Sequence, residues 1–436
     1  MKYFAEWALP YRCHLKLRSI GIPTDLSLQI FRDGITSIGW VVKWRILVAF
    51  GSCCAFRVTD RDSLERVVTT FNRTERKILE FIRFNGPQSR ARLASEFDLT
   101  PSALTRIAQK LIEAGVLRVG RRDHRGQRGQ PPEMMEINPS GGFSVGVSLN
   151  ADRCAVSLVD MNGEVVSRDR LASAGLAPEA ILNAVAAIVD RLVSDKLIAR
   201  ELLLGVGVAL PGPILSSGAV SDIHPELPGW RGMPVAAAFG ERLRLLVSLE
   251  TDGNVAALSE ATFGAGRHMS SFAFVHIDCG LGGGWILGRQ LYRGANGCAA
   301  EFGVLHPRPG LRPSVQDLLD FLRASGVAEA DLFAAAAEDP PREVIERWIA
   351  RAAGQLAELV RTVAWVNDPE AIIVGGSLPR PILSRLVEAV AAMDPRPDGW
   401  PLGMPKILMS ERAGLGLDAA AAHLPIIREQ TLFLLP

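Results

Sequence analysis

A polar face in residues 100–115, TPSALTRIAQKLIEAG, carries the kinds of side chain that proteins use to contact DNA. Hydroxyl, amide, guanidinium and ammonium groups make up this face and its flanks: Ser102, Thr105, Arg106, Gln109 and Lys110. Such groups form hydrogen bonds with base edges in the major groove and with phosphate oxygens. We therefore predict that these side chains bind double-stranded DNA, with Arg106 and Gln109 affecting sequence preference.

A basic loop follows this segment, with the sequence GRRDHRGQRGQPP at residues 120–132. Its arginines are Arg121, Arg122, Arg125 and Arg128, and Asp123 is its one acidic residue. Guanidinium groups suit phosphates and the minor groove, so these four arginines are predicted to bind DNA as well. The repeat RGQRGQ is expected to enter or border the minor groove.

The elements that must position these groups can be read from caps and periodicity. Residues 100–115 fit a helix capped by Thr100, with Pro101 in the first turn and Gly115 as the stop. One apolar stripe is expected to be buried: Leu104, Ile107, Ala108, Leu111 and Ile112. A helix over 89–97 and the tight turn at 98–100 precede it, with Leu99 plugging the gap between two crossed helices.

A third helix and two strands complete the pattern. Asn72 and Glu75 resemble a capping box, and this first helix ends at the breaker 85–87. Residues 116–119 and 133–137 are predicted to be strands on either side of the basic loop. Three helices and a basic hairpin predict a winged helix-turn-helix. The alternative is a helical interaction module with a solvated charged loop.

Length and charge limit the classes of protein that the chain can form. Its 436 residues predict two to four domains, and 48 basic against 47 acidic residues place any DNA contact in a local patch. The six cysteines show no CxxC spacing, which indicates a reduced, cytoplasmic protein. Residues 46–56 are apolar but too short to span a membrane, so no membrane partner is expected. Residues 1–68 are predicted to be a poorly ordered N-terminal extension.

A larger α/β unit is expected after the winged helix, which is assigned to residues 69–138. Strands are predicted at 143–149, 153–160 and 164–170, with a turn at 162–163, then a helix at 177–197 and a buried strand at 203–210. A long helix is expected at 341–368 and a final helix at 417–424, whose alanines at 419–422 indicate tight packing.

Several spaced motifs in this unit resemble the ROK family of bacterial sugar-responsive repressors and sugar kinases. These are GVALPGPI, LPGW at 227–230, ETDGN at 250–254, DCGLGGG at 278–284 and RGANGCAAEFG at 293–303, after a winged helix. The resemblance implies a two-lobed, actin-like sugar-kinase fold over 141–436, with a cleft near 250–303. It also implies a homodimer or homotetramer.

The resemblance places the nucleotide site in doubt. Kinases of the family have a strand of the form GxDxGGT, whereas this chain has Ser148 in place of the Asp and Asn150 in place of a glycine. A hard cation needs carboxylate oxygens, and a phosphate loop needs a bare backbone. We therefore predict that the protein is not an enzyme. The glycines at 280–284 and the segment 372–376 are kept, but tight turns between the lobes are the favoured explanation for them.

The implied sugar site is partly kept. The resemblance assigns effector binding to Thr251, Asp252, Asn254 and Glu301, although Thr251 replaces a usual Asn and Val304 a usual His. Carboxylates are suited to accept hydrogen bonds from sugar hydroxyls. The alternative is structural, with Asp252 as a helix cap and Glu301 as a buried acid. No cysteine follows Cys298, so the structural zinc of many members is expected to be absent, and no cofactor is predicted.

These observations predict a DNA-binding transcriptional regulator that is controlled by a sugar or sugar-like effector. A repressor is the preferred kind of regulator. One alternative is a family sugar kinase, glucokinase-like, with an added DNA-binding domain. Another is a ligand-independent DNA-bound protein that tethers a partner.

Overall fold

The computed structural model describes residues 71–120, 132–150, 152–212, 214, 227, 229–306, 312–327, 342–393 and 403–430. All of them belong to one compact unit of the chain, Phe56–Pro436. The extension predicted over 1–68 and the basic loop arginines lie outside the described residues. Within the described part, no helix has both the length and the apolar character that crossing a membrane requires.

The first element group is a winged helix-turn-helix, as predicted. It contains α3 (Arg73–Asn85), α4 (Arg90–Glu96) and α5 (Pro101–Glu113), with β2 (Leu117–Val119) and β3 (Met134–Ile137) as the hairpin. Strand β1 (Gln88–Ser89), which was not predicted, pairs with β3 and gives the sheet order β1-β3-β2.

The predicted caps of this domain are present. Asn72 Oδ1 accepts from the Glu75 backbone N–H at 2.9 Å, and Glu75 Oε2 accepts from the Asn72 N–H at 2.8 Å, which is a complete capping box. Thr100 caps α5, with Pro101 in the first turn. Leu104, Ala108 and Leu111 are fully buried in the domain core, whereas Ile107 and Ile112 are partly buried at its edge.

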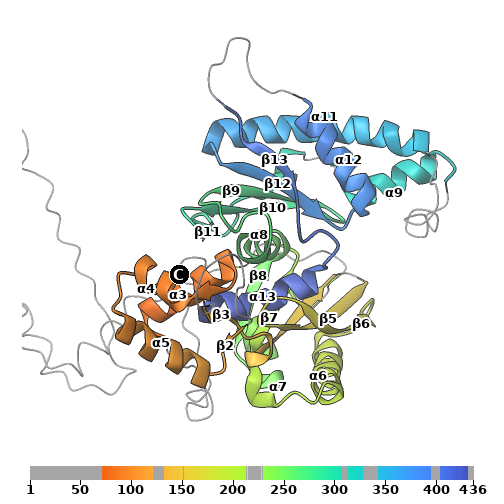
Figure 1. Cartoon of the computed structure of the whole chain (residues 1–436). Coiled ribbons are helices and arrows are strands. Elements are labelled where there is room, and N and C mark those ends of the chain that lie inside the picture. Colours follow the sequence, from red (N-terminus) through yellow and green to blue (C-terminus); the bar gives the residue numbers. More distant parts are fainter. Residues whose placement is uncertain are drawn as a thin grey trace, which may run out of the picture. The chain divides into compact units, whose positions relative to one another are not determined.

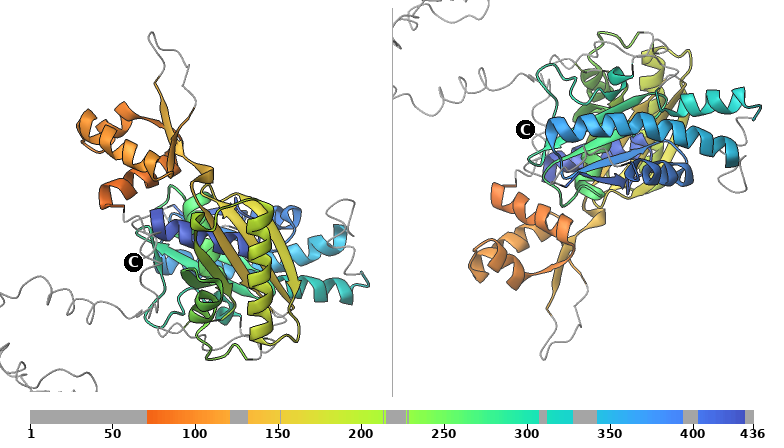
Figure 2. Two further views of the ribbon diagram at one scale, coloured as in Figure 1. Left: turned by 90° about the horizontal axis from the view of Figure 1, so that it is seen from below. Right: turned by 90° about the horizontal axis from the view of Figure 1, so that it is seen from above.

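The first lobe of the α/β unit is a mixed sheet with helices on both faces. Its strand order is β6-β5-β4-β7-β8, from β4 (Phe143–Leu149), β5 (Arg153–Asp160), β6 (Val165–Ala172), β7 (Leu203–Leu210) and β8 (Val247–Thr251). One face packs on α6 (Pro178–Asp195) and α7 (Val235–Leu243), and the other packs on α13 (Leu417–Gln430). Figure 2 shows α6 lying over this sheet.

The second lobe repeats this layering. Its sheet runs β11-β10-β9-β12-β13, from β9 (Phe272–Ile277), β10 (Leu281–Leu287), β11 (Gln290–Tyr292), β12 (Ala371–Gly376) and β13 (Lys406–Met409). One face packs on α9 (Val315–Ala324), α11 (Arg342–Asn367) and α12 (Arg380–Ala391), as Figures 1 and 2 show. The other packs on α8 (Asp252–Phe263), which lies between the two sheets beside α13. Short 3-10 turns lie at Pro139–Gly141, Arg200–Leu202 and Phe302–Leu305.

Two glycines allow α13 to lie directly on the first sheet. Gly146 of β4 and Gly207 of β7 are register partners, and the carbonyls of Asp418 and Ala421 in α13 occupy the space where their side chains would be. The alanines at 419–422 are all buried there. The predicted end of this helix at residue 424 is wrong, because α13 continues through Pro425 to Gln430. Packing of the helix against β4, β7 and α8 outweighs the one hydrogen bond that proline removes.

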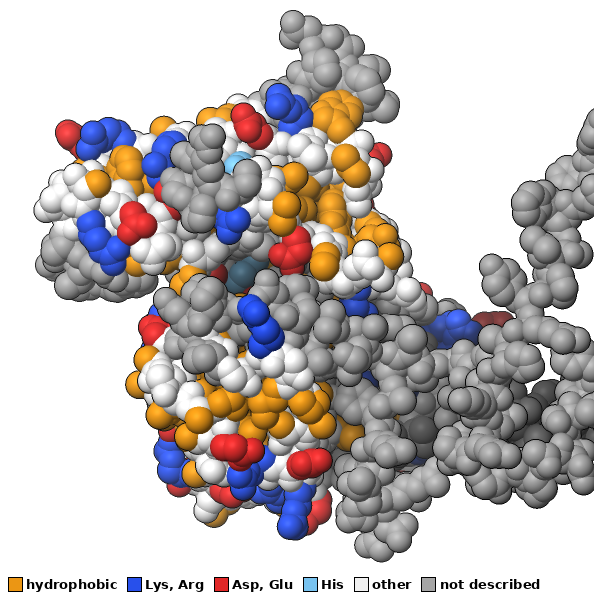
Figure 3. Space-filling model, turned by 180° about the vertical axis from the view of Figure 1, so that it is seen from behind, with side chains coloured by type: hydrophobic (Ala, Val, Ile, Leu, Met, Phe, Trp, Pro, Cys, Tyr) orange, Lys and Arg blue, Asp and Glu red, His pale blue; other side chains and the backbone are white. Residues whose placement is uncertain are grey.

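Charge is distributed evenly where it can be seen. On the face shown in Figure 3, Lys and Arg side chains are interspersed with Asp and Glu rather than gathered into a field of one sign. This agrees with the net charge of +1.

Candidate functional site

The predicted DNA-contacting residues share one side of α5. Pro101, Ser102, Thr105, Arg106, Gln109, Lys110 and Glu113 line a single shallow surface. Thr105 Oγ1 donates to the Pro101 carbonyl at 2.8 Å, and Gln109 Nε2 donates to Glu113 Oε1 at 3.0 Å. Each of these two side chains therefore already has a hydrogen-bond partner within α5.

Lys110 has a role that the sequence analysis did not foresee. Its Nζ lies 2.8 and 2.9 Å from the two carboxylate oxygens of Glu75, which is itself part of the capping box of α3. The ion pair joins the recognition helix to the first helix. Lys110 is thus less available to phosphate than its position on the helix predicts.

A second site lies where α8 begins. Thr251 Oγ1 accepts from the Asn254 N–H at 3.4 Å and caps α8, so the structure gives Thr251 a local structural role. Asp252 is the first residue of the helix and is not its cap. Its Oδ1 is shielded from solvent and has no hydrogen-bond partner. Burial raises the pKa of Asp252 to about 7.

Three other titratable groups affect Asp252. Its pKa is lowered by His276 and raised further by the carboxylates of Asp278 and Glu301. His276 lies next to the last residue of the buried strand β9, Asp278 follows that strand, and Glu301 immediately precedes the turn Phe302–Leu305. The structure therefore brings the predicted Asp252 and Glu301 together with two residues that were not predicted.

An ion pair secures the base of this site. Arg293 Nε donates to Glu250 Oε1 at 2.8 Å, and Asn254 Nδ2 donates to Glu250 Oε2 at 3.0 Å. Glu250 and Asn254 are buried. The predicted effector residue Asn254 thus uses its amide group to fix the carboxylate of Glu250, while its Oδ1 has no hydrogen-bond partner.

Close packing explains some of the glycines of the DCGLGGG motif. A side chain on Gly253 at the start of α8 would lie 2.7 Å from the backbone nitrogen of Gly283 in β10, and one on Gly283 would meet Phe302 and the Phe274 carbonyl. By contrast, Gly280 and Gly282 face open space. The backbone contact between α8 and β10 therefore requires a glycine at position 253, and the packing of Phe302 and the Phe274 carbonyl requires one at position 283, whether or not nucleotide binds.

The strand that departs from the kinase pattern has ordinary structural contacts. Ser148 is buried in β4. Asn150 follows β4, its N–H donates to the Arg153 carbonyl at 2.8 Å, and its carbonyl accepts from Ser173 Oγ at 3.3 Å. Asn150 therefore holds the turn between β4 and β5.

The far end of α8 contacts the winged helix domain. Phe263, the last residue of α8, lies under the guanidinium of Arg83 from α3, with 4.9 Å between the Arg83 Cζ and the ring centroid. Desolvation lowers the pKa of Arg83 to about 10, opposed by the nearby charge of Asp160. The interface also contains Met161, which is fully buried in the winged helix core.

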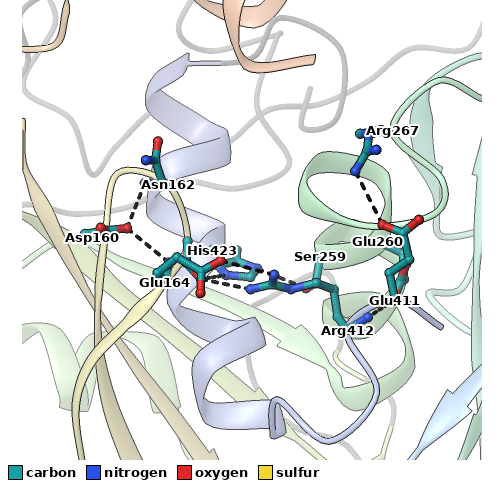
Figure 4. A network of polar contacts seen from close by, with 10 residues as sticks. Asp160, Asn162, Glu164, Ser259, Glu260, Arg267, Glu411, Arg412 and His423 are labelled. Carbon is teal, nitrogen blue, oxygen red and sulfur yellow. Dashed lines mark hydrogen bonds and ion pairs between the residues drawn. The ribbon is translucent and has the colours of Figure 1, made fainter. Parts of the chain in front are cut away.

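A polar network holds this end of α8 in place (Figure 4). His423 of α13 lies 2.9 Å from Ser259 Oγ and 3.1 Å from the Gly163 carbonyl, and burial lowers its pKa to about 3. Glu260 of α8 accepts from the Arg412 N–H at 2.9 Å, and Arg412 donates to the Gly163 carbonyl at 3.0 Å. The end of α8 is therefore tied both to α13 and to the β5–β6 turn.

The short strand β11 makes a second connection. Arg289, just before it, lies 3.4 Å from Glu80 and 4.7 Å above the ring of Phe84, both in α3. Arg293, just after it, binds Glu250 beside the cleft. One three-residue strand thus separates a contact with the DNA-binding domain from a contact with the candidate effector site.

Comparisons with known proteins agree with this architecture. Residues 144–314 match the ROK family, and residues 71–118 match the winged helix-turn-helix DNA-binding family. The uncharacterized protein y4fQ of Sinorhizobium fredii is 31% identical over 363 residues, which are 82% of this chain and 91% of that protein. The xylose repressor of Bacillus subtilis is 26% identical over 230 residues, or 52% of this chain and 59% of the repressor.

Among solved structures, a ROK family transcriptional regulator, homolog of the Escherichia coli MLC protein, superimposes with a TM-score of 0.60 and 19% identity. The match covers 82% of this chain and 96% of that one. It supports the predicted combination of a winged helix and a two-lobed sugar-kinase-like fold.

Proposed function

Because this chain belongs to the ROK family and carries a winged helix-turn-helix DNA-binding domain, we propose that it is a transcriptional regulator of the repressor type. We further propose that the cleft of its ROK domain binds a sugar-like effector. The observation that carries the proposal is the continuity between the two sites. Helix α8 begins at the cleft with Asp252 and ends at Phe263 against Arg83 of the DNA-binding domain.

An effector can regulate DNA binding only if it binds two conformations unequally. Asp252 and Glu301 provide acceptors for hydroxyl groups, and α8 and β11 both join their neighbourhood to α3. A shift of either element as the lobes close on a ligand would move the surface on which α3 rests. The proposed assembly is a homodimer or homotetramer acting on DNA in the cytoplasm, since two-fold symmetry would fit palindromic operators.

Removing the carboxylate of Asp252 or of Glu301 should abolish the response to effector while leaving DNA binding intact. A coupling of about 1–3 kcal/mol changes operator affinity by roughly 5- to 150-fold. We expect that the Asp252→Asn and Glu301→Gln variants bind operator as the parent does but fail to release it with any sugar that releases the parent. The measurement is the affinity of each variant for operator-containing promoter DNA in the presence of each sugar of a monosaccharide and polyol panel.

A variant at the other end of the connection provides the matched control. Arg289→Met removes the contacts with Glu80 and Phe84 but leaves the cleft unchanged. It should still bind the effector, measured by calorimetry, and release operator less than the parent does. If all three variants respond to effector like the parent, the ligand binds elsewhere. If no sugar affects operator affinity in the parent, a ligand-independent tethering protein is the better reading.

The basic loop should supply affinity more than sequence preference. We expect that Arg125→Ala with Arg128→Ala weakens binding to many sequences and reduces the slope of log affinity against log salt by roughly one unit for each lost phosphate contact. Arg106→Ala is the matched variant, which should instead relax sequence preference, because α5 presents Arg106 beside Ser102 on its outer surface. An unchanged slope in the double variant would remove this loop from the DNA interface.

Phosphoryl transfer is the competing function, favoured by the retained Asp252 and the glycines at 280–284. We propose that the protein is not a kinase, because Ser148 and Asn150 serve the strand and its turn, and Asp278 places a carboxylate beside the glycine loop. Purified protein with Mg-ATP and a panel of aldohexoses should therefore form no sugar phosphate above background. Turnover on the order of 1 s⁻¹, ordinary for an enzyme, would overturn this expectation.

A further inference from the structure

Among the described residues of the candidate effector site, carboxylates outnumber the cations that pair with them. Asp252, Asp278 and Glu301 lie close enough for the last two to disfavour ionisation of the first. Within the described residues, no lysine or arginine forms an ion pair with Asp252 or Glu301. The one basic ring near them belongs to His276, whose Nε2 lies 3.8 Å from Asp278 Oδ2.

His276 is an independent sign of a missing ligand. Side chains alternate along β9, and Phe272 and Phe274 pack in the core that contains α8, so His276 faces α8 as well. Only 5% of the residue is exposed, and neither ring nitrogen has a partner within hydrogen-bond distance, since the Asp278 carboxylate lies 3.8 Å from Nε2. Buried polar groups in proteins are nearly always hydrogen-bonded, and the exceptions need an explanation. A ligand that enters between Asp252 and Asp278 would supply the missing partner.

The balance of donors and acceptors defines the ligand chemistry. Ionised carboxylates only accept hydrogen bonds, and Asp252 Oδ1 is a buried acceptor with no donor. A phosphate group adds further acceptors and negative charge, so the site repels it. Hydroxyl groups supply single donors, whereas an ammonium group supplies three donors and the positive charge that the cluster lacks.

We propose that the effector carries a protonated amine as well as hydroxyl groups, as amino sugars and aminated polyols do, and that His276 and Asp278 determine this specificity. The inference rests on the proposed function only in placing the effector in this cleft. Neither residue belongs to the resemblance-based sugar site, which consists of Thr251, Asp252, Asn254 and Glu301.

The test compares sugars that differ only in the amine. Calorimetry with the full chain at pH 7 uses glucosamine with glucose, galactosamine with galactose, and mannosamine with mannose, together with the N-acetyl and 6-phosphate forms. At least one amine should bind about tenfold or more tightly than its hydroxyl counterpart, the strength expected of a hydrogen bond to a charged group. The phosphorylated forms should bind more weakly than either.

Variants then assign the preference to the cluster. Asp278→Asn should bring the ratio of amine affinity to hydroxyl affinity close to one. His276→Gln, which keeps a hydrogen-bonding side chain, should reduce the affinity for both sugars. The matched control is Asp195→Asn, a change of an exposed carboxylate on α6, which should leave both affinities unchanged.

The outcomes separate this inference from the proposed function. If neutral sugars release operator but no amine is preferred, the regulator stands and the amine proposal is overturned. If an amine is preferred but operator affinity does not change, the specificity stands and the regulatory role fails. Equal binding within every pair, no binding at all, tighter binding of a phosphorylated form, or a preference that persists in Asp278→Asn each overturns the proposal.

Discussion

Gly207→Ala should destabilise the protein by more than about 3 kcal/mol and send much of it into the insoluble fraction. The added methyl would lie 2.6 Å from the carbonyl carbon of Ala421, which is backbone and cannot rotate away. Overpacking of a close-packed core costs about 1–3 kcal/mol where side chains can adjust, and more where they cannot. Here α13 is also held from the other side by α8. Thermal unfolding and the soluble yield provide the measurement.

The matched control is the same substitution at a glycine with free space. Gly354 lies inside helix α11, and no atom is within 4 Å of the position that its side chain would take. Gly354→Ala should stabilise the protein by about 0.5–1 kcal/mol, because alanine loses less backbone entropy in a helix. If Gly207→Ala were as well tolerated as Gly354→Ala, the close contact between α13 and β7 would be wrong.

Asp252→Asn should stabilise the ligand-free protein, and the gain should grow with pH. Burial raises the pKa of Asp252 from its ordinary 3.8 to about 7, with His276 opposing the shift and Asp278 and Glu301 adding to it. A raised pKa means that folding favours the protonated acid, so stability is fully present below pH 3.8 and is lost as the pH rises toward 7. The loss reaches about 4 kcal/mol at pH 8 and only about 2 kcal/mol at pH 5.

Asparagine cannot ionise, so the variant does not lose this folding stability as the pH rises. The melting temperature of the variant should therefore exceed that of the parent by roughly 2–4 °C for each kcal/mol, with a larger difference at pH 8 than at pH 5. Asp320→Asn, at an exposed position on α9, should show no such pH-dependent gain. A difference that is constant or shrinks with pH would mean that Asp252 is not held in a desolvated site. Stabilisation combined with loss of effector response would mark Asp252 as a residue kept for binding at the expense of stability.

Local signals predicted the winged helix well because its caps and stripes are contained in short segments. Asn72, Glu75, Thr100 and Pro101 occupy the predicted cap positions. The pairing of Lys110 with Glu75 could not be predicted in the same way, since it joins residues of different helices. It depends on how α3 and α5 cross.

Helix α8 was not predicted because its own sequence lacks the periodic pattern that identifies the helices of the winged helix domain. It is buried on nearly every side between two sheets, so its sequence has no apolar stripe with a polar face opposite. The end of α13 was misplaced because Pro425 is an ordinary stop signal that tertiary packing overrides. In both helices the surroundings, and not the local sequence, decide the outcome.

The residues of the candidate site likewise divide into those that the sequence indicated and one that only the structure revealed. The family resemblance led to Asp252 and Glu301, and the charge of Glu301 raises the pKa of Asp252. His276 was missed because one histidine in an apolar strand most often belongs to a satisfied core. The signal that distinguishes it is the lack of hydrogen-bond partners, and only coordinates reveal that.

The position of α13 has a consequence for synthesis on the ribosome. The winged helix is built from one continuous stretch except for Met161 of the β5–β6 turn, which completes its core, and it can fold soon after β3 emerges. The first lobe cannot, because β4 and β7 expose Gly146 and Gly207 until α13, made much later, covers them. A nascent chain thus presents a nearly complete winged helix before the α/β domain that follows it can fold. Ribosomes that stall between β12 and α13 would release a fragment that carries the winged helix without a folded first lobe.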